Sequence, residues 1–334
     1  MSDRVSIVVP CLNEERYIES CILSLLNSDY PADDLEIIII DGGSTDLSPS
    51  IIDRFKDQHT IIKVFQNPDK ITPVSLNIGI KNSTGDYILI ASAHSCFPAE
   101  YIHELMKLMH GTGCDVIGGG IDTRVINSNP VSEAIVKVLS SGFGVGNSKF
   151  RTEKSETIPV DTVPFGIYKK QIFTSAGLYN ENLVRNHDIE FSKRLAGFGF
   201  KILLVSSIRC IYYARENYRD LAKNSFSNGL WNIMAVYITK RFSSLSLRHF
   251  IPLIFVLSLI IPGILALIIN WRFALVTVIS ALSYIGLIVM ASLRLRTELA
   301  GGFKIFMGFL VLHTSYGAGS LAGLFHIGKL IKRF

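Results

Sequence analysis

The sequence lacks the features that mark nucleic-acid-binding, redox and zinc proteins. Charged residues make up only 18% of the 334 positions, and no basic run is interleaved with aromatic residues, so we expect no nucleic-acid partner. None of the five cysteines belongs to a CxxC motif, and an odd number cannot pair completely. We therefore expect reduced, buried thiols in a cytosolic domain.

We also expect no signal peptide, because MSDRVSIVVP leads directly into a predicted strand. Apolar residues, in contrast, are abundant: they make up 49% of the chain, and the mean hydropathy is +0.36. The excess lies in uncharged runs after residue 250, while the earlier residues form an ordinary globular mixture. We predict a globular domain at 1–240 and a membrane domain at 241–334.

The apolar part contains three candidate membrane-spanning segments. Residues 250–270 and 273–293 carry no charge over about the length needed to cross a bilayer. Only Trp271–Arg272 joins them, which predicts a tight helical hairpin. Residues 306–328 are less apolar and contain a GxxxG spacing, which permits close helix packing but is also expected by chance in so glycine-rich a segment.

Short apolar runs alternate with helical patterns in the first 110 residues. Short, continuous apolar runs predict buried strands, and their alternation with helices predicts a parallel sheet that is covered on both faces. No GxGxxG follows the first run, which argues against an NAD-binding Rossmann domain. The four runs are VSIVVP, LEIIIID, IIKVFQN and GDYILIAS.

Polar clusters follow three of these predicted strands: Pro10–Asn13, Asp41–Asp46 and Ser92–His94. Ligands of parallel α/β sheets bind beyond the carboxyl ends of the strands, so we expect the three clusters to form one site. Asn13 also suits the N-cap of the helix that follows, with two glutamates in the first turn, where negative charge is favourable.

Five stretches carry longer motifs: VSIVVPCLNEERYIESCILSLL, IIIIDGGSTDLS, SLNIGIKNSTGDYILIASAH, GFGVGNSKFR and VDTVPFGIYKKQIFTSAGLYNENLVRNHDIEFSKRL. Together they resemble the inverting family-2 glycosyltransferases. The resemblance implies the α/β GT-A fold, a Rossmann-like, mainly parallel sheet with helices on both faces, followed by a transmembrane segment. The last two stretches are most similar to the membrane-attached succinoglycan-type glucosyltransferases of bacterial exopolysaccharide synthesis.

The resemblance implies a nucleotide-sugar donor, a UDP-sugar, at the strand ends. An Asp that matches Asp41 accepts a hydrogen bond from the base in the family; the alternative is an aspartate that only caps a turn and a helix. The same two interpretations apply to Asp46. Asn77 matches a family position near the donor, or is a plain helix residue. The residues implied at the donor are Pro10, Asn13, Glu14, Asp41, Asn77, Ser92 and Ala93.

Inverting transfer needs a base that takes the proton of the attacking hydroxyl. The family places this base, an Asp, at the start of a helix below the donor, usually after another acid. By resemblance, RNHDIEFSKRL offers Asp188 as the catalytic residue, with His187 in place of the preceding acid. A solvated carboxylate at a helix start is the alternative interpretation of Asp188.

The metal motif departs from the family's pattern. Related enzymes have Asp-Ala-His where this chain has Ser92-Ala93-His94. A divalent metal on the donor diphosphate, Mn²⁺ or Mg²⁺, prefers carboxylate oxygen, and Mn²⁺ also accepts imidazole, so His94 is the candidate metal ligand. The alternative is a His94 that only packs beside the Phe97–Pro98 turn. The candidates for supplying missing positive charge are Lys70, Lys169, Lys170 and Arg194.

These inferences predict a glycosyltransferase that moves a hexose to a lipid-linked oligosaccharide. The alternatives are a polyprenyl-phosphate glycosyltransferase and a non-catalytic, degenerate transferase that acts as a membrane scaffold. NSFSNGLW (224–231) lacks the Gln and Arg of the Gln-x-x-Arg-Trp motif of processive relatives, which argues against processive synthesis. Its Trp231 either stacks on an acceptor sugar or marks the membrane interface.

Membrane orientation follows from the donor and from the charges. Donor nucleotides are cytosolic, so we expect a multi-pass protein of the cell membrane with a cytoplasmic catalytic domain. Lys240, Arg241 and Arg248 precede the first span and RLRTELAGGFK follows the second, in agreement with the positive-inside tendency. Hydrophobic length favours a third crossing, which would export the basic end KLIKRF; a re-entrant or interfacial last segment is the alternative.

Overall fold

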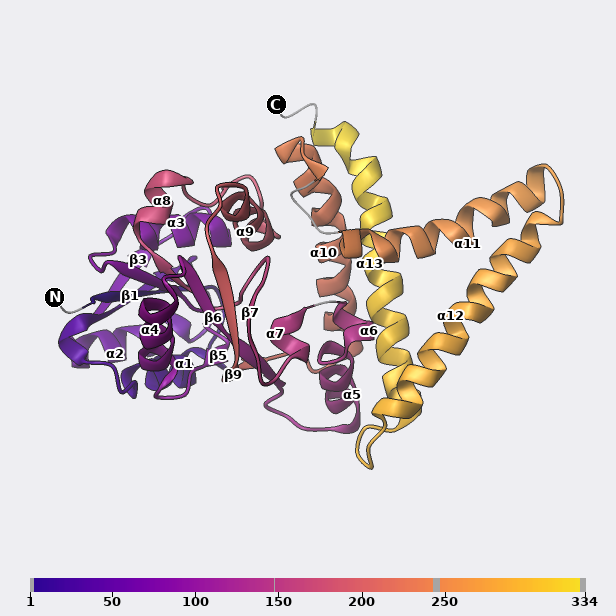
Figure 1. Cartoon of the computed structure of the whole chain (residues 1–334). Helices are drawn as coiled ribbons and strands as arrows, with labels where there is room; N and C mark the ends of the chain where they lie inside the picture. The colour runs from indigo at the N-terminus through magenta and orange to yellow at the C-terminus, as the bar shows by residue number, and fades with distance from the viewer. Residues whose placement is uncertain (1–2, 147, 243–246, 331–334) are drawn as a thin grey trace. The chain divides into compact units, whose positions relative to one another are not determined.

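The chain folds into two compact units (Figure 1). The computed structural model describes residues 3–146, 148–242 and 247–330, with side chains up to residue 326. The sheet unit contains Met1–Asp122 and Lys149–Tyr213, and the helical unit contains Thr123–Ser148 and Ala214–Phe334. The functional division at residue 240, into a catalytic and a membrane domain, stays a prediction.

The parallel half of the sheet follows the expected alternation of strands and helices. β1 pairs with β2 and β4, and β2 pairs with β3, all in parallel. β1 and β2 are buried almost throughout, because helices cover their continuous apolar runs on both faces. These strands are β1 (Val5–Cys11), β2 (Leu35–Asp41), β3 (Ile62–Gln66) and β4 (Tyr87–Ile90).

An antiparallel half completes a nine-stranded sheet of order β3-β2-β1-β4-β8-β6-β9-β5, with β7 paired to β9. β8 is antiparallel to β4 and β6, and the short β5 is antiparallel to β9. The β5–β9 pairing sets Ser95 opposite Tyr212 and so brings the loop after β4 against β9. The strands are β5 (Ser95–Cys96), β6 (Val116–Arg124), β7 (Thr157–Pro159), β8 (Ile167–Lys169) and β9 (Ile202–Tyr213).

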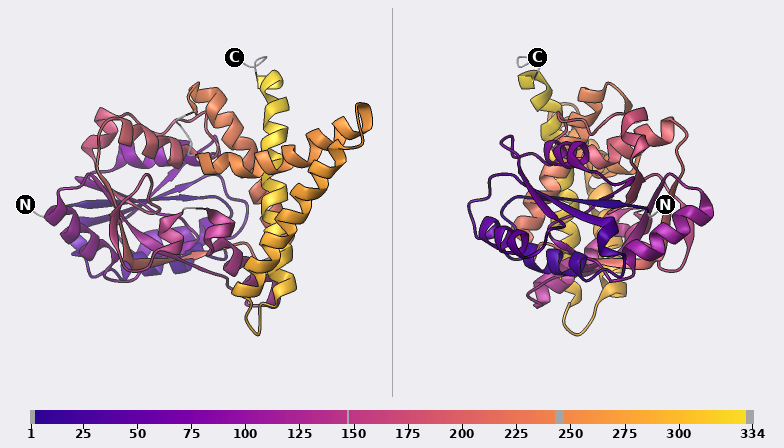
Figure 2. Two further views of the ribbon diagram at one scale, coloured as in Figure 1. Left: turned by 45° about the vertical axis from the view of Figure 1, so that its right-hand side comes forward. Right: turned by 90° about the vertical axis from the view of Figure 1, so that its left-hand side faces the viewer.

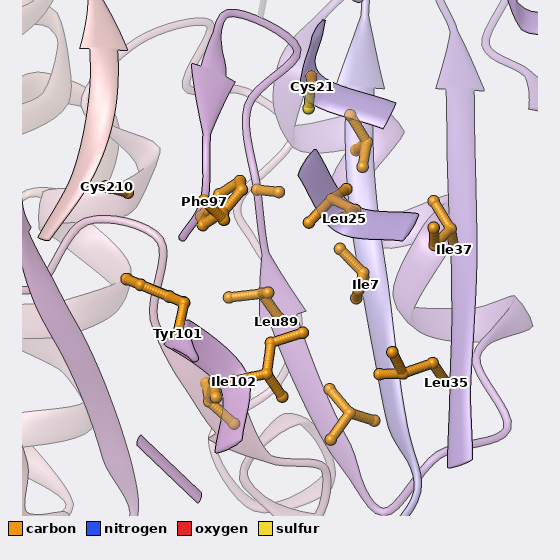
Figure 3. Close-up of a cluster of buried hydrophobic side chains, with 14 of the residues drawn as sticks. Ile7, Cys21, Leu25, Leu35, Ile37, Leu89, Phe97, Tyr101, Ile102 and Cys210 are labelled. Atoms are coloured by element: carbon orange, nitrogen blue, oxygen red, sulfur yellow. The ribbon is translucent and has the colours of Figure 1, made fainter. Parts of the chain in front are cut away.

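Helices cover both faces of this sheet, as expected (Figure 1). Ile37 and Ile39 belong to the apolar core formed with α1, α2 and α4, part of which Figure 3 shows. Ile38 and Ile40 belong to the core formed with α3, α8 and α9, as the two-residue period of a strand requires. The helices are α1 (Ile18–Leu26), η1 (Ala32–Asp34), α2 (Ser48–Gln58), α3 (Thr72–Asn82), α4 (Tyr101–Thr112), α7 (Lys149–Thr152), α8 (Gln171–Ser175) and α9 (His187–Gly197).

The helical unit is built around α13, whose buried Ile305 and Phe309 share an apolar core with α5, α10 and α12. Gly319 and Gly323 let α10 approach closely: a Cβ on Gly319 would lie 2.0 Å from the Phe226 carbonyl oxygen. The GxxxG spacing therefore serves helix packing. The helices are α5 (Pro130–Leu139), α6 (Gly142–Val145), α10 (Tyr218–Thr239), η3 (Leu247–Phe250), α11 (Ile251–Ile268), α12 (Phe273–Leu295) and α13 (Gly302–Leu330).

Three helices in the described part of the chain are long and apolar enough to cross a membrane: Leu247–Ile268, Phe273–Leu295 and Gly302–His326. Their bounds lie close to the segments expected from the sequence. Only 6% of each of the first two is buried within the protein, against 39% of the third. The third helix therefore has a different environment from the hairpin formed by the first two.

Candidate active site

The loop after β1 is held against the loop after β2 by polar side chains. The Asn13 N–H donates to Ser44 Oγ (2.8 Å), and Asn13 Oδ1 accepts a hydrogen bond from the Thr45 N–H (2.8 Å). The Glu14 N–H donates to Ser48 Oγ (2.8 Å). Two of the three polar clusters at the strand ends therefore form one continuous rim.

The expectation that Asn13 caps the first helix is wrong. Asn13 has a left-handed backbone (φ 55°), and α1 begins only at Ile18, with Tyr17 at its N-cap position and no capping side chain. The Asn13 amide oxygen bonds Thr45 instead. The Thr45 N–H of the neighbouring loop thus binds the Asn13 side chain, which the local sequence pattern had predicted to cap the first helix.

Asp41 ends β2 and is only 4% exposed. Its carboxylate accepts hydrogen bonds from the N–H groups of Gly43 and Ser44 (3.2 Å each) and from Ser44 Oγ (2.6 Å). Gly43 supplies the left-handed φ of 74° that this turn requires. The turn therefore holds a buried carboxylate in a fixed position at the rim.

Lys70 lies over this turn. Its Nζ is 3.8 Å from the position that a Cβ would take on Gly43. The other three candidate cations bind other partners: Lys169 pairs with Asp115 (3.0 Å), Lys170 donates to the Ser83 carbonyl oxygen (2.6 Å), and Arg194 pairs with Glu190 (3.0 Å). Lys70 is thus the one of the four that contacts the rim.

Asp46 connects the first two loops through hydrogen bonds. It accepts from the N–H of Glu15 (3.0 Å) and from the N–H of Ser48 (2.9 Å) at the start of α2. Burial acts to raise the pKa of Asp46, but the hydrogen bonds from Ser48 and Glu15 hold it below the ordinary value. These contacts favour the structural interpretation of Asp46, in the turn that leads into α2, although Leu47 and not Asp46 occupies the N-cap position.

The third loop joins the rim through His94. His94 Nδ1 lies 2.9 Å from Glu14 Oε1, and the two side chains are only 22% and 17% exposed. Ser92 Oγ lies 3.3 Å from both ring nitrogens of His94. All three clusters at the strand ends are therefore brought together. Glu14, expected at the nucleotide, is here the partner of His94.

Aromatic residues that the sequence analysis did not single out surround His94. Its ring lies edge-to-face with Tyr212 (centroids 5.1 Å apart) and Tyr17 (6.2 Å). The Arg151 guanidinium stands 5.0 Å from the Tyr212 ring centroid and brings a second cation to this part of the rim. The sequence feature that could have indicated this aromatic cluster is the tyrosine pair Tyr212–Tyr213 at the end of β9.

Two residues implied at the donor contribute backbone rather than polar side chains. Pro10 lies in the β1–β2 ladder opposite Ile40. Ala93 is 1% exposed and belongs to the apolar core beneath the rim. Both therefore fix the shape of the rim.

Asn77 of α3 is 2% exposed, and its amide group is engaged at both ends. Nδ2 donates to the Tyr179 carbonyl oxygen (2.9 Å) and to Glu181 Oε1 (2.8 Å), while Oδ1 accepts from the Tyr179 N–H (3.0 Å). These bonds fix the loop that precedes α9. Asn77 therefore binds this loop, although the resemblance implied a place at the donor.

Asp188 lies in the first turn of α9 and is exposed. Burial raises the pKa of the nearby Tyr168 hydroxyl to about 12, and the Asp188 carboxylate adds to this rise. Next to it, His187 packs edge-to-face on Tyr179 (5.8 Å), and burial lowers the pKa of its imidazole. His187 thus brings a buried ring whose neutral form is favoured, and not a second acid, to the position before Asp188.

The described residues contain no group of three or more His, Cys, Asp or Glu side chains that could hold a metal ion. The Glu14–His94 pair offers one carboxylate and one imidazole, with the Ser92 hydroxyl beside them. Divalent metals in phosphate-binding sites take one or two protein ligands and complete their coordination with phosphate oxygens and water. The pair fits a site of that kind.

Comparison with known proteins agrees with this arrangement. The model of the family described as glycosyl transferase family 2 matches residues 6–175. A dolichyl N-acetyl-alpha-D-glucosaminyl phosphate 3-beta-D-2,3-diacetamido-2,3-dideoxy-beta-D-glucuronosyltransferase of Methanococcus voltae is 32% identical over 78% of this chain and 82% of its own. The succinoglycan biosynthesis protein ExoA of Rhizobium meliloti is 27% identical over 94% of this chain and 92% of its own.

A solved structure shares the fold. The mannosyltransferase PcManGT from Pyrobaculum calidifontis, in complex with GDP-Man and Mn²⁺, has a TM-score of 0.59 and 15% identity over 96% of this chain and 87% of that one. At this identity the likeness concerns the fold alone, a GT-A-like mixed sheet followed by C-terminal helices. With the family match across half of the sequence, it leads to one conclusion: the chain belongs to glycosyl transferase family 2.

Proposed function

We propose that this glycosyltransferase moves a hexose from a UDP-sugar to a lipid-linked oligosaccharide, with inversion at the anomeric carbon. The observation that carries the proposal is the rim in which Asn13, Glu14 and His94 tie together the loops after β1, β2 and β4. In parallel α/β sheets this edge is where nucleotides bind. Inversion rests on the resemblance of the motifs to the inverting family.

Asp41 is the proposed acceptor for the N–H of the nucleotide base. Its carboxylate is buried and held by N–H groups of its own turn, so it is oriented before a ligand arrives. Lys70, which lies over Gly43, would contribute positive charge near the nucleotide. Pro10 and Asn13 shape the loop against which the base would pack.

Glu14 and His94 are the proposed ligands of a divalent metal, with Ser92 beside them. When bound, such an ion would neutralise charge on the donor diphosphate and so stabilise the leaving group. Imidazole favours Mn²⁺ over Mg²⁺ in this role. The Arg151 guanidinium, one aromatic ring away from His94, is a further cation on the same side of the rim.

Asp188 is the proposed base. An exposed carboxylate in the first turn of α9 is open to an acceptor hydroxyl. Taking the proton as the hydroxyl attacks would contribute on the order of 10²–10⁴-fold to the rate. Asn77 has a positioning role in this scheme, because it fixes the loop that leads into α9.

The proposed acceptor follows from the relatives and from the apolar helices. The Methanococcus voltae relative is named for a dolichyl-linked sugar phosphate, and the Rhizobium meliloti relative for succinoglycan biosynthesis. Three helices with the length and composition of membrane spans would hold the chain where such lipids reside. We place the protein in the cell membrane as a multi-pass protein, with the sheet unit on the cytoplasmic side, where nucleotide sugars are made.

Transfer by the full-length protein in lipid vesicles tests the proposal. The assay supplies labelled UDP- and GDP-sugars, Mn²⁺, and a lipid extract that contains polyprenyl-linked sugars. We expect label from a UDP-sugar to enter the lipid fraction. Donor binding without transfer to any lipid would favour the degenerate transferase, and transfer to polyprenyl phosphate alone would favour the polyprenyl-phosphate glycosyltransferase.

A further inference from the structure

The two most apolar helices, α11 and α12, form an antiparallel hairpin. Thr277 Oγ1 donates to the Leu259 carbonyl oxygen (3.3 Å), and the rings of Phe255 and Tyr284 lie 4.1 Å apart. This register sets the first turn of α11 level with about residues 284–287 of α12, so the last two turns of α12 extend past the start of α11. We call this end the base of the hairpin; its tip is the connection at residues 269–272.

Helix α13 contacts the hairpin at the start of α11 and along the second half of α12. The Cβ position of Gly302 lies 3.9 Å from the Ser292 carbonyl oxygen, His313 Nδ1 lies 3.2 Å from the Tyr284 hydroxyl, and Gly317 packs on Pro252. Gly302 and Gly317 are about 22 Å apart along a helix. Their partners, Ser292 and Pro252, are in this register only roughly 10 Å apart along the hairpin.

Helix α13 therefore crosses the base of the hairpin and does not run alongside it. Figure 1 shows α13 (yellow) upright, with the hairpin (orange) pointing away from it, and the left view of Figure 2 shows the same divergence at the tip. If the hairpin crosses a bilayer from base to tip, α13 lies near the bilayer surface at which the hairpin enters.

The position of Arg248 leads to the same conclusion. Its side chain lies over Gly146, and Pro252, one helical turn further along the chain, packs on Gly317, next to Tyr316. Tyr316 is the midpoint of α13, so a membrane-spanning α13 would hold the Arg248 guanidinium near the centre of the bilayer. Charged side chains at that depth are rare and cost free energy. At the hairpin base the same guanidinium lies among lipid headgroups.

Helix α10 runs beside α13 in the same direction. The Tyr218 hydroxyl donates to the Lys304 carbonyl oxygen (2.7 Å) near the start of both helices, and Gly323 packs on Leu230 further along. The first two turns of α10 carry Arg219, Asp220 and Lys223. Two helices that lie in the plane of the bilayer surface keep such charges in contact with water.

One face of α13 is apolar and only partly covered. Phe303 and Phe325, near its two ends, are 75% and 76% exposed. Between them, residues three or four positions apart continue the same face of the helix. This uncharged stripe consists of Phe303, Met307, Leu310, Thr314, Ala318, Leu321 and Phe325.

We propose that only the α11–α12 hairpin crosses the bilayer, while α10 and α13 lie together in its surface, with the stripe of α13 turned toward the acyl chains. The proposal rests on the membrane location inferred above. Two crossings return the chain to its starting side, which keeps the basic end KLIKRF on the cytoplasmic side; its last four residues lie outside the described range. On this proposal, the apolar residues that made 306–328 long enough for a third span face the acyl chains from the bilayer surface as the stripe.

Depth measurements on single spin labels test this arrangement. Labels are attached to cysteines at Phe303, Leu310, Ala318 and Phe325 of the full chain in lipid vesicles. We expect all four to report one shallow depth, within about one helical turn of 5 Å. A gradient along α13, with Ala318 near the bilayer centre and Phe303 at the surface, would overturn the in-plane position.

Labels at Ile254, Ile261 and Ile268 of α11 provide the matched control, because they are exposed and extend from base to tip. We expect these labels to show a depth gradient. Gradients in both helices would reject the surface position of α13 but leave the membrane location intact. Shallow depths in both would reject the hairpin as a span, and with it the location. Of the five native cysteines four are buried, and the parent chain gives their background.

Discussion

Glu14 and His94 stand 80 positions apart in the chain, yet Glu14 Oε1 and His94 Nδ1 lie 2.9 Å apart at the carboxyl edge of the sheet. They meet because β1 and β4 are parallel neighbours, so the loops that follow them leave the sheet side by side. The sequence predicted that these loops share a site. The pairing itself gives the site a carboxylate near the position where Ser92 replaces the family's aspartate.

If His94 is a metal ligand, replacing it weakens metal binding as well as transfer. We expect His94→Ala to lose most activity and to abolish the binding of Mn²⁺ measured by calorimetry in the presence of UDP. His103→Ala, on the exposed face of α4, is the control and retains both. Activity that survives His94→Ala and resists EDTA would show that this histidine only packs among aromatic rings.

Restoring the missing carboxylate tests the same site by adding a metal ligand instead of removing one. Ser92→Asp places an acid beside His94, and we expect it to raise activity or to extend metal use from Mn²⁺ to Mg²⁺, which prefers oxygen ligands. Initial rates across a series of metal concentrations give the comparison. An inactive parent chain that becomes active with Ser92→Asp would identify the natural chain as a degenerate transferase.

Asp41 is expected to contribute to nucleotide affinity through its charge. A hydrogen bond to a charged group is worth about 1.5–3 kcal/mol, so Asp41→Ala should weaken UDP binding roughly ten- to hundredfold. Asp41→Asn keeps an acceptor for the N–H groups of Gly43 and Ser44 and so separates loss of charge from loss of the turn. Equal UDP affinity of Asp41→Asn, Asp41→Ala and the parent in calorimetry would contradict the assignment.

Asn77 should act on the loop before α9 and not on the donor. Asn77→Ala leaves buried backbone groups of Tyr179 without partners, which costs about 1–3 kcal/mol of stability. We expect a lower unfolding temperature and a lower turnover rate, with UDP affinity unchanged. Asn82→Ala, exposed at the end of the same helix, is the control. A selective loss of UDP affinity in Asn77→Ala would return this residue to the donor site.

Glu36 makes the stability of the sheet unit depend on acid. Burial acts to raise its pKa, but hydrogen bonds from Lys63, Ser6 and Thr84 lower it to about 2, from an ordinary value of 4.5. Because the folded pKa is depressed, this stabilisation, on the order of 3 kcal/mol, is complete above about pH 4.5 and is lost as the pH falls toward 2. Unfolding temperatures against pH should show this loss in the parent and not in Glu36→Gln.

The sequence predicted the parallel strands well, because short β-branched runs that are buried on both faces leave a continuous apolar signal. The same runs predicted which polar clusters meet at the sheet edge, since strand direction alone decides this. The antiparallel half was harder to predict, because β5 has only two residues and β9 returns from a distant part of the chain.

Side-chain partners were the part that the sequence did not predict. Asn13 is a residue type that often caps helices, but its side chain accepts a hydrogen bond from the Thr45 N–H of another loop. Asn77 lies at a position that the family associates with the donor, yet its amide meets Tyr179, which is 102 positions away. Such choices depend on distances between loops, and these are set by packing beneath the rim.

The central claim is tested most directly by transfer from a labelled UDP-sugar to lipid-linked acceptor in Asp188→Asn. Because the base acts on the acceptor, we predict a rate that falls by roughly 10²–10⁴-fold, with UDP affinity within twofold of the parent. Asp57→Asn, exposed on α2, should match the parent in both measurements. A rate for Asp188→Asn that equals the parent's would remove Asp188 from the reaction and contradict this account of the site.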